Sequence, residues 1–408
     1  MNEKHAASHV TALIHHPYEP PAGFAAPQPG VFKASTVYFP TVAAMRQFEW
    51  KDKSAYTYGL HGTPTTYTLE ERLCALEGGQ QCLLVPSGLA ALATVSLALL
   101  KSGDEVLLPD NAYGPNKALA EGELLQYGIT HQYYDPMRPD DLSARMNERT
   151  RLVWLEAPGS VSMEFPDLPE LVHRCKAQGV LCALDNTWGA GLAFQPFDLR
   201  RDGHLGVDIS VHALTKYPSG GGDVLMGSVI TREPSLHLKL KLCHMRLGLG
   251  VGANDAEAVL RSLPSMALRY AAHDRSARTL AAWWQGQLQC VQVLHPAMPD
   301  SPGHAQWQSL CASEGAGLAA GLFSVMIDAR YSQAQVDAFC DGLTLFKIGY
   351  SWGGPVSLVM PYNLQSMRQH ALPHLQPGTL VRFSVGLESA DDLIKDLQQS
   401  AARHLPEQ

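Results

Sequence analysis

The sequence predicts an α/β protein in which a mixed, mostly parallel central sheet is followed by a smaller α/β domain. From Thr66 to about residue 265, short continuous apolar runs alternate with segments whose apolar residues recur at helical spacing. Continuous apolar runs are typical of strands buried on both faces, as in a parallel sheet covered by helices. Glycine, proline, asparagine and aspartate separate these segments, which indicates strand ends and helix caps.

The chain has 408 residues, which is long enough for two or three domains. We expect an N-terminal arm over residues 1–65 that contacts the neighbouring subunit, a central domain over 66–265 and a C-terminal domain over 266–408. Repeated prolines exclude long helices from the arm. An aromatic segment without a core pattern often packs on a partner subunit, and the alternative is a partly disordered tail.

Each element of the central domain has its own signal. A leucine stripe at 69, 73 and 76 stops at Gly78-Gly79, which predicts a helix and its C-cap. Asp167 is placed to cap the helix that follows it. The remaining apolar runs predict a helix over residues 89–100 and strands over 82–85, 105–108, 152–155, 180–184 and 207–211.

The C-terminal domain is expected to open with a long helix over 270–290 and to contain strands at 321–327 and 379–385. In the last strand the side-chain period of two places Arg382 on the face opposite Val381 and Phe383. The same pattern predicts that Val385 and Leu387 continue the apolar face.

Composition narrows the class of protein. Apolar residues make up 46% of the chain, charged residues 17%, and the net charge is -8, which is typical of a compact globular protein. Without a basic tract, neither nucleic acid nor an anionic membrane is an expected partner. The first residues show no signal-peptide pattern and no apolar run is long enough to span a membrane, so we expect a cytoplasmic protein. The eight cysteines form no C-x-x-C pair and the histidines no H-E-x-x-H motif, so no metal site is expected.

Lys216 is the most informative single residue. It follows an apolar run and precedes the glycine-rich turn 218–223, so it lies where a strand of an α/β sheet ends and ligands usually bind. A partly desolvated lysine loses its charge readily and becomes a nucleophilic amine. The neighbouring Thr215 hydroxyl is able to bind a phosphate. An amine beside a phosphate acceptor suggests a pyridoxal phosphate Schiff base; the alternative is a solvated surface lysine.

Two further strand ends fit the same cofactor. Ser87-Gly88-Leu89 opens a helix directly after a strand, where free N–H groups and the helix dipole favour a phosphate. Asp185 ends a buried strand, and a carboxylate there is able to pair with a protonated pyridine nitrogen. The alternatives are an ordinary turn at Gly88 and a capping aspartate at 185.

Two residues are candidates for ring and substrate contacts. Tyr113 follows a strand, where an aromatic ring is able to stack on a planar cofactor. Arg382 is able to bind a substrate carboxylate through two parallel hydrogen bonds. The alternatives are a packed tyrosine and an exposed strand arginine.

Together the motifs resemble the Cys/Met-metabolism pyridoxal phosphate enzymes, in order, over nearly the whole chain from about residue 30. Within that family they look most like the cystathionine β-lyases. The segments that carry the resemblance are Tyr58-Gly-Leu-His-Gly-Thr-Pro-Thr65, Leu76-Glu-Gly-Gly79, Pro86-Ser-Gly-Leu-Ala-Ala91, Asn111-Ala-Tyr113, Leu155-Glu-Ala-Pro-Gly-Ser160, Ser162-Met-Glu164, Asp185-Asn-Thr-Trp188, Leu214-Thr-Lys-Tyr217, Tyr350-Ser-Trp-Gly-Gly354 and Val381-Arg382.

The resemblance implies a fold-type-I enzyme that uses pyridoxal 5'-phosphate. It implies that Lys216 binds the cofactor covalently and then moves the α-proton, that Asp185 binds the pyridine nitrogen and that Tyr113 stacks on the ring. Gly88, Leu89 and Thr215 are implied to hold the phosphate.

The resemblance also implies that the site is shared between subunits. Tyr58 is implied to reach the neighbour's phosphate, in a homotetramer built as a dimer of dimers. Ser351 and Arg382 are implied to bind the substrate α-carboxylate. Leu60 stands where the family usually has an arginine that contacts the neighbour's phosphate, and Ala213 stands where many members have a phosphate-binding serine.

The implied activity is β-elimination on a sulfur amino acid, namely cystathionine and water to homocysteine, pyruvate and ammonia in methionine biosynthesis. A γ-lyase, a γ-synthase or a cysteine desulfhydrase of the same family is the alternative. From other classes, a cofactor-binding protein without catalysis is disfavoured by the intact candidate set, and a nicotinamide-dependent dehydrogenase by the lack of a G-x-G-x-x-G motif after a strand.

Overall fold

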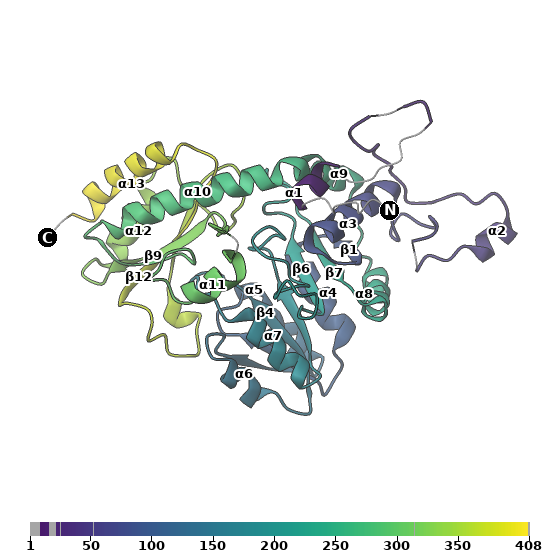
Figure 1. Cartoon of the computed structure of the whole chain (residues 1–408), viewed down its shortest axis with the longest axis horizontal. Coiled ribbons are helices and arrows are strands. Elements are labelled where there is room, and N and C mark those ends of the chain that lie inside the picture. Colours follow the sequence, from purple (N-terminus) through teal and green to yellow (C-terminus); the bar gives the residue numbers. More distant parts are fainter. Residues whose placement is uncertain (1–8, 16–21, 25, 52, 314, 407–408) are drawn as a thin grey trace.

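The computed structural model describes residues 9–15, 22–24, 26–51, 53–313 and 315–406 and contains two sheets (Figure 1). The larger has seven strands in the order β1-β7-β6-β5-β4-β2-β3, and the smaller has five in the order β10-β11-β12-β9-β8. The strands are β1 Gln81–Val85, β2 Glu105–Pro109, β3 Thr130–Tyr134, β4 Thr150–Glu156, β5 Leu181–Asp185, β6 Ile209–Ala213, β7 Gly227–Thr231, β8 Cys290–Leu294, β9 Leu322–Asp328, β10 Lys347–Ile348, β11 Leu358–Tyr362 and β12 Gly378–Ser384.

The predicted mixed, mostly parallel sheet is confirmed. Strands β6, β5, β4, β2 and β3 run parallel, whereas β7 pairs antiparallel with both β1 and β6. The α-helices are α1 His9–Ile14, α2 Val42–Gln47, α3 Pro64–Glu77, α4 Gly88–Leu99, α5 Gly114–Leu119, α6 Pro139–Arg145, α7 Leu168–Ala177, α8 Pro234–Leu247, α9 Ala253–Ser262, α10 Met266–Gln285, α11 His304–Cys311, α12 Gln333–Asp341 and α13 Ala390–His404.

Helices cover both faces of the larger sheet, as its continuous apolar strands require. On one face α3 and α7 pack their leucines against Cys182 and Leu184 of β5. On the other face α4 and α8 pack against Ala183 and Val211. Successive side chains of β5 point to opposite faces of the sheet, so they pack into two separate hydrophobic cores.

Helix α10 joins the two parts of the fold. Its first turns place Met266 and Tyr270 in the core of the larger sheet, and its last turns place Leu280 and Trp284 in the core of the smaller sheet. Figure 1 shows it running from α9 toward α13 across both parts. The domain boundaries near residues 65 and 265 stay a prediction.

Two predicted caps are confirmed. Helix α3 ends at Gly78, which adopts the left-handed conformation at φ 75° that a glycine tolerates without strain. Asp167 caps α7, because its side chain accepts a hydrogen bond from the N–H of Glu170.

Two predictions need correction. The prolines of the arm predict irregular structure, but the short helices α1 and α2, of six residues each, interrupt it. Leu387 does not continue the apolar face of the last strand, because β12 ends at Ser384 and the Leu387 side chain is exposed. The strand ends before the period of two reaches that residue.

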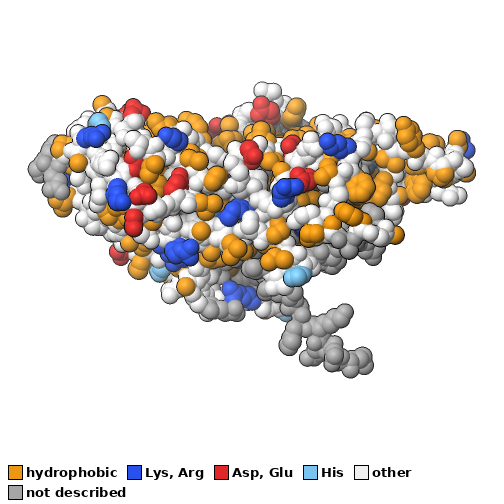
Figure 2. Space-filling model, turned by 90° about the horizontal axis from the view of Figure 1, so that it is seen from above, with side chains coloured by type: hydrophobic (Ala, Val, Ile, Leu, Met, Phe, Trp, Pro, Cys, Tyr) orange, Lys and Arg blue, Asp and Glu red, His pale blue; other side chains and the backbone are white. Residues whose placement is uncertain are grey.

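The arm extends away from the body of the molecule at α2 (Figure 1). Hydrophobic side chains gather on it at the right-hand end of Figure 2, and the exposed ones include Phe32, Tyr38, Val42, Met45 and Phe48. An apolar surface of this kind is typical of a protein–protein contact. Within the described part of the chain, no helix combines the length and the apolar character needed to cross a membrane. The start of the chain, where a signal peptide was not expected, lies outside the described residues.

Candidate active site

A cavity of about 590 Å³ lies at the carboxyl ends of the parallel strands, between the larger sheet and the smaller one. Ligands of open α/β sheets bind at this edge because the strand ends and helix N-termini converge there. Of the predicted site residues, Lys216, Asp185, Tyr113, Gly88, Leu89, Thr215, Ser351 and Arg382 line this cavity. Tyr58 does not line it.

Lys216 lies just beyond β6, and its side chain reaches the opposite wall of the cavity. Its Nζ donates a hydrogen bond to the Ser351 Oγ at 2.8 Å and lies 5.5 Å from the centre of the Trp352 ring. Burial, aided by the positive charge of Arg382 and opposed by Asp185, lowers the pKa of Lys216 to about 8. A substantial fraction of this amine is therefore neutral near physiological pH, as a nucleophile or base requires.

A close backbone contact places Ser351 beside the lysine. A Cβ on Gly353 would lie 3.0 Å from the Tyr217 N and 3.3 Å from the Lys216 Cα, and Gly353 has a φ of 77°. Only glycine combines that conformation with that approach. The segment 350–354 therefore crosses directly over the lysine-bearing turn.

Asp185 ends β5 with its carboxylate oriented by Thr187. The Thr187 hydroxyl donates to the Asp185 Oδ1 at 2.6 Å and its N–H donates at 3.1 Å. Burial raises the pKa of Asp185, and these hydrogen bonds oppose the rise. The charge of Lys216 also opposes the rise, but no described lysine or arginine forms an ion pair with Asp185, so the carboxylate is available to a cationic N–H group inside the cavity.

Glu156 is a second acid at this edge that sequence reasoning missed. It ends β4 and pairs in register with Asp185 on β5, and it also lines the cavity. Its Oε2 accepts the N–H of Tyr113 at 2.8 Å, and burial raises its pKa well above the usual range, with Asp185 adding to the rise. The signal was present in the sequence, since Glu156 follows a buried strand just as Asp185 does.

Tyr113 is held by its backbone, while its ring stays free. The residue is 40% exposed and lines the cavity. The Glu156 hydrogen bond to the Tyr113 N–H fixes the turn that carries it. This arrangement leaves one ring face available for stacking.

Arg382 is a buried cation. Its side chain is almost inaccessible, with the residue only 4% exposed, and burial lowers its pKa. Its Nη2 donates to the Tyr350 carbonyl at 2.6 Å, its Nη1 lies 3.4 Å from the Ser160 carbonyl, and the guanidinium carbon is 5.3 Å from the Tyr362 ring centre. No described acid pairs with it, so its charge is available to an anionic ligand.

We expect Arg382→Lys to weaken amino-acid binding far more than cofactor binding, because an ammonium cannot present two parallel N–H groups to a carboxylate. The loss in kcat/KM should be on the order of a hundredfold, as for a charge-assisted pair. Steady-state kinetics measures the effect on the amino acid, and titration of the apoenzyme with the cofactor measures the effect on cofactor affinity. Equal losses of substrate and cofactor affinity would instead place Arg382 in the scaffold.

The helix N-terminus at Gly88 forms one corner of the cavity. The Ser87 Oγ accepts the N–H of Ala90 and caps α4. A Cβ on Gly88 would lie 2.6 Å from the Ala213 Cβ, so glycine lets the helix start approach β6. Thr215 lies beside this corner, with its Oγ1 3.3 Å from both the N and the O of Met226.

Tyr58 lies on the arm, outside the cavity of its own chain. It forms an isolated antiparallel bridge with Thr36, and its ring is exposed. The nearby His61 shares a hydrogen bond of 2.9 Å between its Nδ1 and the Thr57 Oγ1, and its ring stacks on Trp50. The role of Tyr58 across a subunit boundary therefore stays a prediction.

Fold and cavity together define an α/β enzyme with an activated lysine at a strand end. A family model described as Cys/Met metabolism PLP-dependent enzyme matches residues 10–402. The chain belongs to this family and is a pyridoxal phosphate-dependent enzyme.

Among similar proteins, a cystathionine beta-lyase from Bordetella avium is 36% identical over 98% of both chains. An L-alanine/L-glutamate racemase from Wolbachia pipientis is 33% identical over 92% of both chains. A solved structure of cystathionine gamma synthase from Xanthomonas oryzae pv. oryzae has a TM-score of 0.85, 28% identity and coverage of 98% of this chain and 99% of that chain.

The residues present fit pyridoxal phosphate. The cavity contains an amine of lowered pKa in Lys216 and a buried carboxylate in Asp185 that forms no ion pair with a described lysine or arginine. The helix start at Gly88, which lines the cavity, offers its backbone N–H groups to a phosphate. These are the groups that the aldehyde, the ring nitrogen and the phosphate of the cofactor require.

The leucine at position 60 predicts a weaker hold on the cofactor phosphate than an arginine would give. Leu60 and His61 border a small cavity with Lys241 and His244, and burial, together with the charge of Lys241 and the neighbouring His244, lowers the pKa of His61. A neutral His61 is a poor substitute for a guanidinium. We expect Leu60→Arg to lower the cofactor dissociation constant about tenfold or more, as one charge-assisted hydrogen bond is worth about 1.5–3 kcal/mol.

Equilibrium dialysis of the apoenzyme measures this constant, with His61→Ala as the companion variant. If His61 contributes to phosphate binding, its removal should raise the constant. Unchanged constants in both variants would mean that the loop does not reach the phosphate.

Proposed function

We propose that the chain catalyses β-elimination on cystathionine, in which cystathionine and water give homocysteine, pyruvate and ammonia. The observation that carries the proposal is the convergence of Lys216, Ser351 and Arg382 on one cavity, with the Lys216 Nζ 2.8 Å from the Ser351 Oγ. The full-length similarity to the cystathionine beta-lyase of Bordetella avium supports the choice of substrate.

Arg382 and Ser351 orient the substrate. The guanidinium of Arg382 binds the α-carboxylate, and its two carbonyl contacts and the Tyr362 ring hold it in place. Ser351, whose Oγ accepts a hydrogen bond from the Lys216 Nζ, is proposed to contact the same carboxylate. An amino acid held at these points presents its Cα–H to the lysine.

Bound pyridoxal phosphate supplies a ring that takes up the electron pair left when Cα loses its proton. Lys216, once its amine is free, accepts that proton as a general base. Asp185 would pair with the protonated ring nitrogen of the bound cofactor, and Tyr113 would stack on its ring. Breakage of the Cβ–S bond releases homocysteine as the thiol, after protonation, and the remaining 2-aminoacrylate hydrolyses in water to pyruvate and ammonia.

A product assay tests the proposal. Purified enzyme with L-cystathionine should yield pyruvate and homocysteine in equal amounts, measured by mass spectrometry. A γ-cleavage would yield 2-oxobutyrate and cysteine, and formation of D-alanine from L-alanine would indicate racemisation as the main reaction. Formation of 2-oxobutyrate from cystathionine, or of D-alanine from L-alanine, in place of pyruvate would overturn the assignment.

We also propose that the enzyme is a cytoplasmic homotetramer with active sites shared between subunits. The support is the extended arm with its exposed Phe32, Tyr38 and Phe48, and the position of Tyr58 outside the cavity of its own chain. In this arrangement residues 1–65 form the arm, 66–265 the cofactor domain and 266–408 the C-terminal domain.

A further inference from the structure

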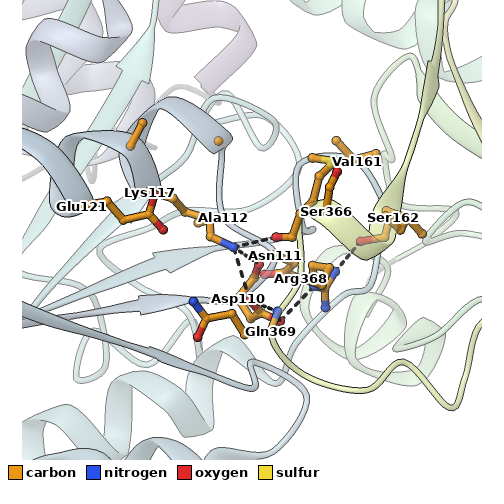
Figure 3. Close-up of a pocket in the computed structure, with 14 residues that line it drawn as sticks. Asp110, Asn111, Ala112, Lys117, Glu121, Val161, Ser162, Ser366, Arg368 and Gln369 are labelled. Atoms are coloured by element: carbon orange, nitrogen blue, oxygen red, sulfur yellow. Dashed lines mark hydrogen bonds and ion pairs between the residues drawn. The ribbon is translucent and has the colours of Figure 1, made fainter.

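Figure 3 shows a second cavity, of about 260 Å³. The two cavities share Gly114, Val161 and Met367 in their walls. Beside this shared wall lies a charged cluster that the mechanism does not use. It consists of Asp110, Lys117, Glu164 and Arg368, with Ser162.

Asp110 is the centre of the charged cluster. Its side chain is fully buried at the end of the β2 strand. It accepts the N–H groups of Gln369 and His370 at 2.9–3.0 Å, the Arg368 Nε at 3.3 Å and the Lys117 Nζ at 3.3 Å. The His370 Nδ1 also lies near this carboxylate, 3.2 Å from the Asp110 Oδ2. Burial would raise the pKa of Asp110, but these contacts outweigh burial and lower it.

Arg368 connects Asp110 to Glu164. Its Nη1 donates to the Ser162 Oγ at 2.8 Å and to the Glu164 Oε1 at 3.1 Å. Glu164 also accepts from the His374 Nε2 at 3.0 Å and the Asn111 Nδ2 at 3.2 Å. Two acids, Asp110 and Glu164, thus face one lysine and one arginine, so the formal charges of these four side chains balance.

The cluster ties a C-terminal segment to the turn that carries Tyr113. Lys117 donates to the Met367 carbonyl at 2.7 Å, while Asp110 binds the next three residues of the same segment. Figure 3 shows Arg368 and Gln369 reaching across to Asp110. Met367 and Tyr113, which both line the active-site cavity, are therefore held at fixed positions relative to each other.

We propose that the charged cluster is a positioning device that selects substrates by the length of the group beyond Cβ. The inference rests on the proposed function. Lys216 and Arg382 take up the amino and carboxylate groups of one amino-acid end, so the remaining arm of a thioether must occupy the rest of the cavity. Tyr113, Gly114 and Met367 line the cavity beside the charged cluster, and we assign them to the wall that this arm contacts. A short substrate does not reach this wall.

The test compares a long and a short substrate in the holoenzyme. For Arg368→Met we expect KM for L-cystathionine to rise about tenfold, because displacement of the Met367 segment misplaces the long substrate, while Glu156 still holds the Tyr113 turn. For β-chloroalanine, whose leaving group is one chloride, kcat and KM should stay within about twofold of wild type. Arg330→Met is the matched control, since Arg330 forms an exposed pair with Asp328 at 2.7 Å in the same part of the chain. This control variant should leave kcat and KM unchanged for both substrates.

Met367→Ala alters the wall without touching the ion pairs, and it should show the same split between substrates. If Arg368→Met does not fold, the kinetics of Met367→Ala alone test the proposed selection by length. Equal losses on both substrates in Arg368→Met, or an unchanged KM for cystathionine in Met367→Ala, would overturn the proposal. Wild-type enzyme that eliminates from β-chloroalanine but not from cystathionine would instead disprove the proposed function.

Discussion

Lys216→Ala is expected to abolish turnover and covalent attachment of the cofactor while the protein still folds. Lys216 is the only lysine that lines the active-site cavity within the described part of the chain. Its removal takes away the covalent anchor and the base for the Cα proton together. Loss of a positioned base alone costs about 10²–10⁴ in rate, so we expect activity below about a thousandth of wild type.

Pyruvate release from cystathionine measures the loss, and borohydride reduction followed by peptide mass spectrometry locates the attachment. Wild type should carry reduced cofactor on the peptide that contains Lys216, and the variant none. Lys395→Ala, which removes an exposed lysine paired with Asp392, is the control and should behave as wild type. Near wild-type turnover by Lys216→Ala would show that the assignment is wrong.

The pH dependence of attachment gives an independent check on Lys216. Its pKa is lowered to about 8, so the neutral amine becomes the main form above that pH. The rate at which apoenzyme attaches the cofactor should therefore rise with pH and level off above about pH 8. An amine with an ordinary lysine pKa near 10.4 would keep gaining rate for about two further pH units. Stopped-flow absorbance distinguishes the two profiles.

Short-range signals were enough to predict the strand ends that build the site. The apolar runs before Asp185 and Lys216 identify buried strands, and the glycines at 78 and 88 identify a helix end and a helix start. These features depend on neighbours a few residues apart, which a sequence displays directly. The placement of Arg382 on the strand face that meets the cavity follows from the side-chain period of two.

The parts that could not be predicted depend on contacts between distant residues. Asp110 and Arg368 are separated by 258 positions, so no local pattern indicates their pairing. The pairing of Glu156 with Asp185 depends on which strands are neighbours, and that order is set by the fold as a whole. The exposure of Leu387 depends on where β12 ends, which its periodicity does not determine.

Asp185→Asn is expected to bind the cofactor but to lose at least about a hundredfold in kcat. A neutral amide does not keep the ring nitrogen protonated, so the ring accepts electrons poorly, and removal of one preorganised electrostatic contact typically costs about 10²–10³ in kcat. Asparagine retains an acceptor for the two Thr187 hydrogen bonds at 2.6 and 3.1 Å, so local geometry should survive.

The same substitution should stabilise the apoprotein, which separates an electrostatic role from a structural one. Burial raises the pKa of Asp185. A carboxyl whose folded-state pKa is raised above its unfolded value contributes stability at low pH that is lost as pH rises through the two pKa values. At pH 7 the buried charge therefore destabilises the fold, and the neutral asparagine removes that cost. Thermal unfolding of the two apoproteins should give a higher midpoint for Asp185→Asn at pH 7 and a smaller difference near pH 4. A variant with normal kcat, or with a lower midpoint at pH 7, would mean that Asp185 only shapes the turn at the end of β5.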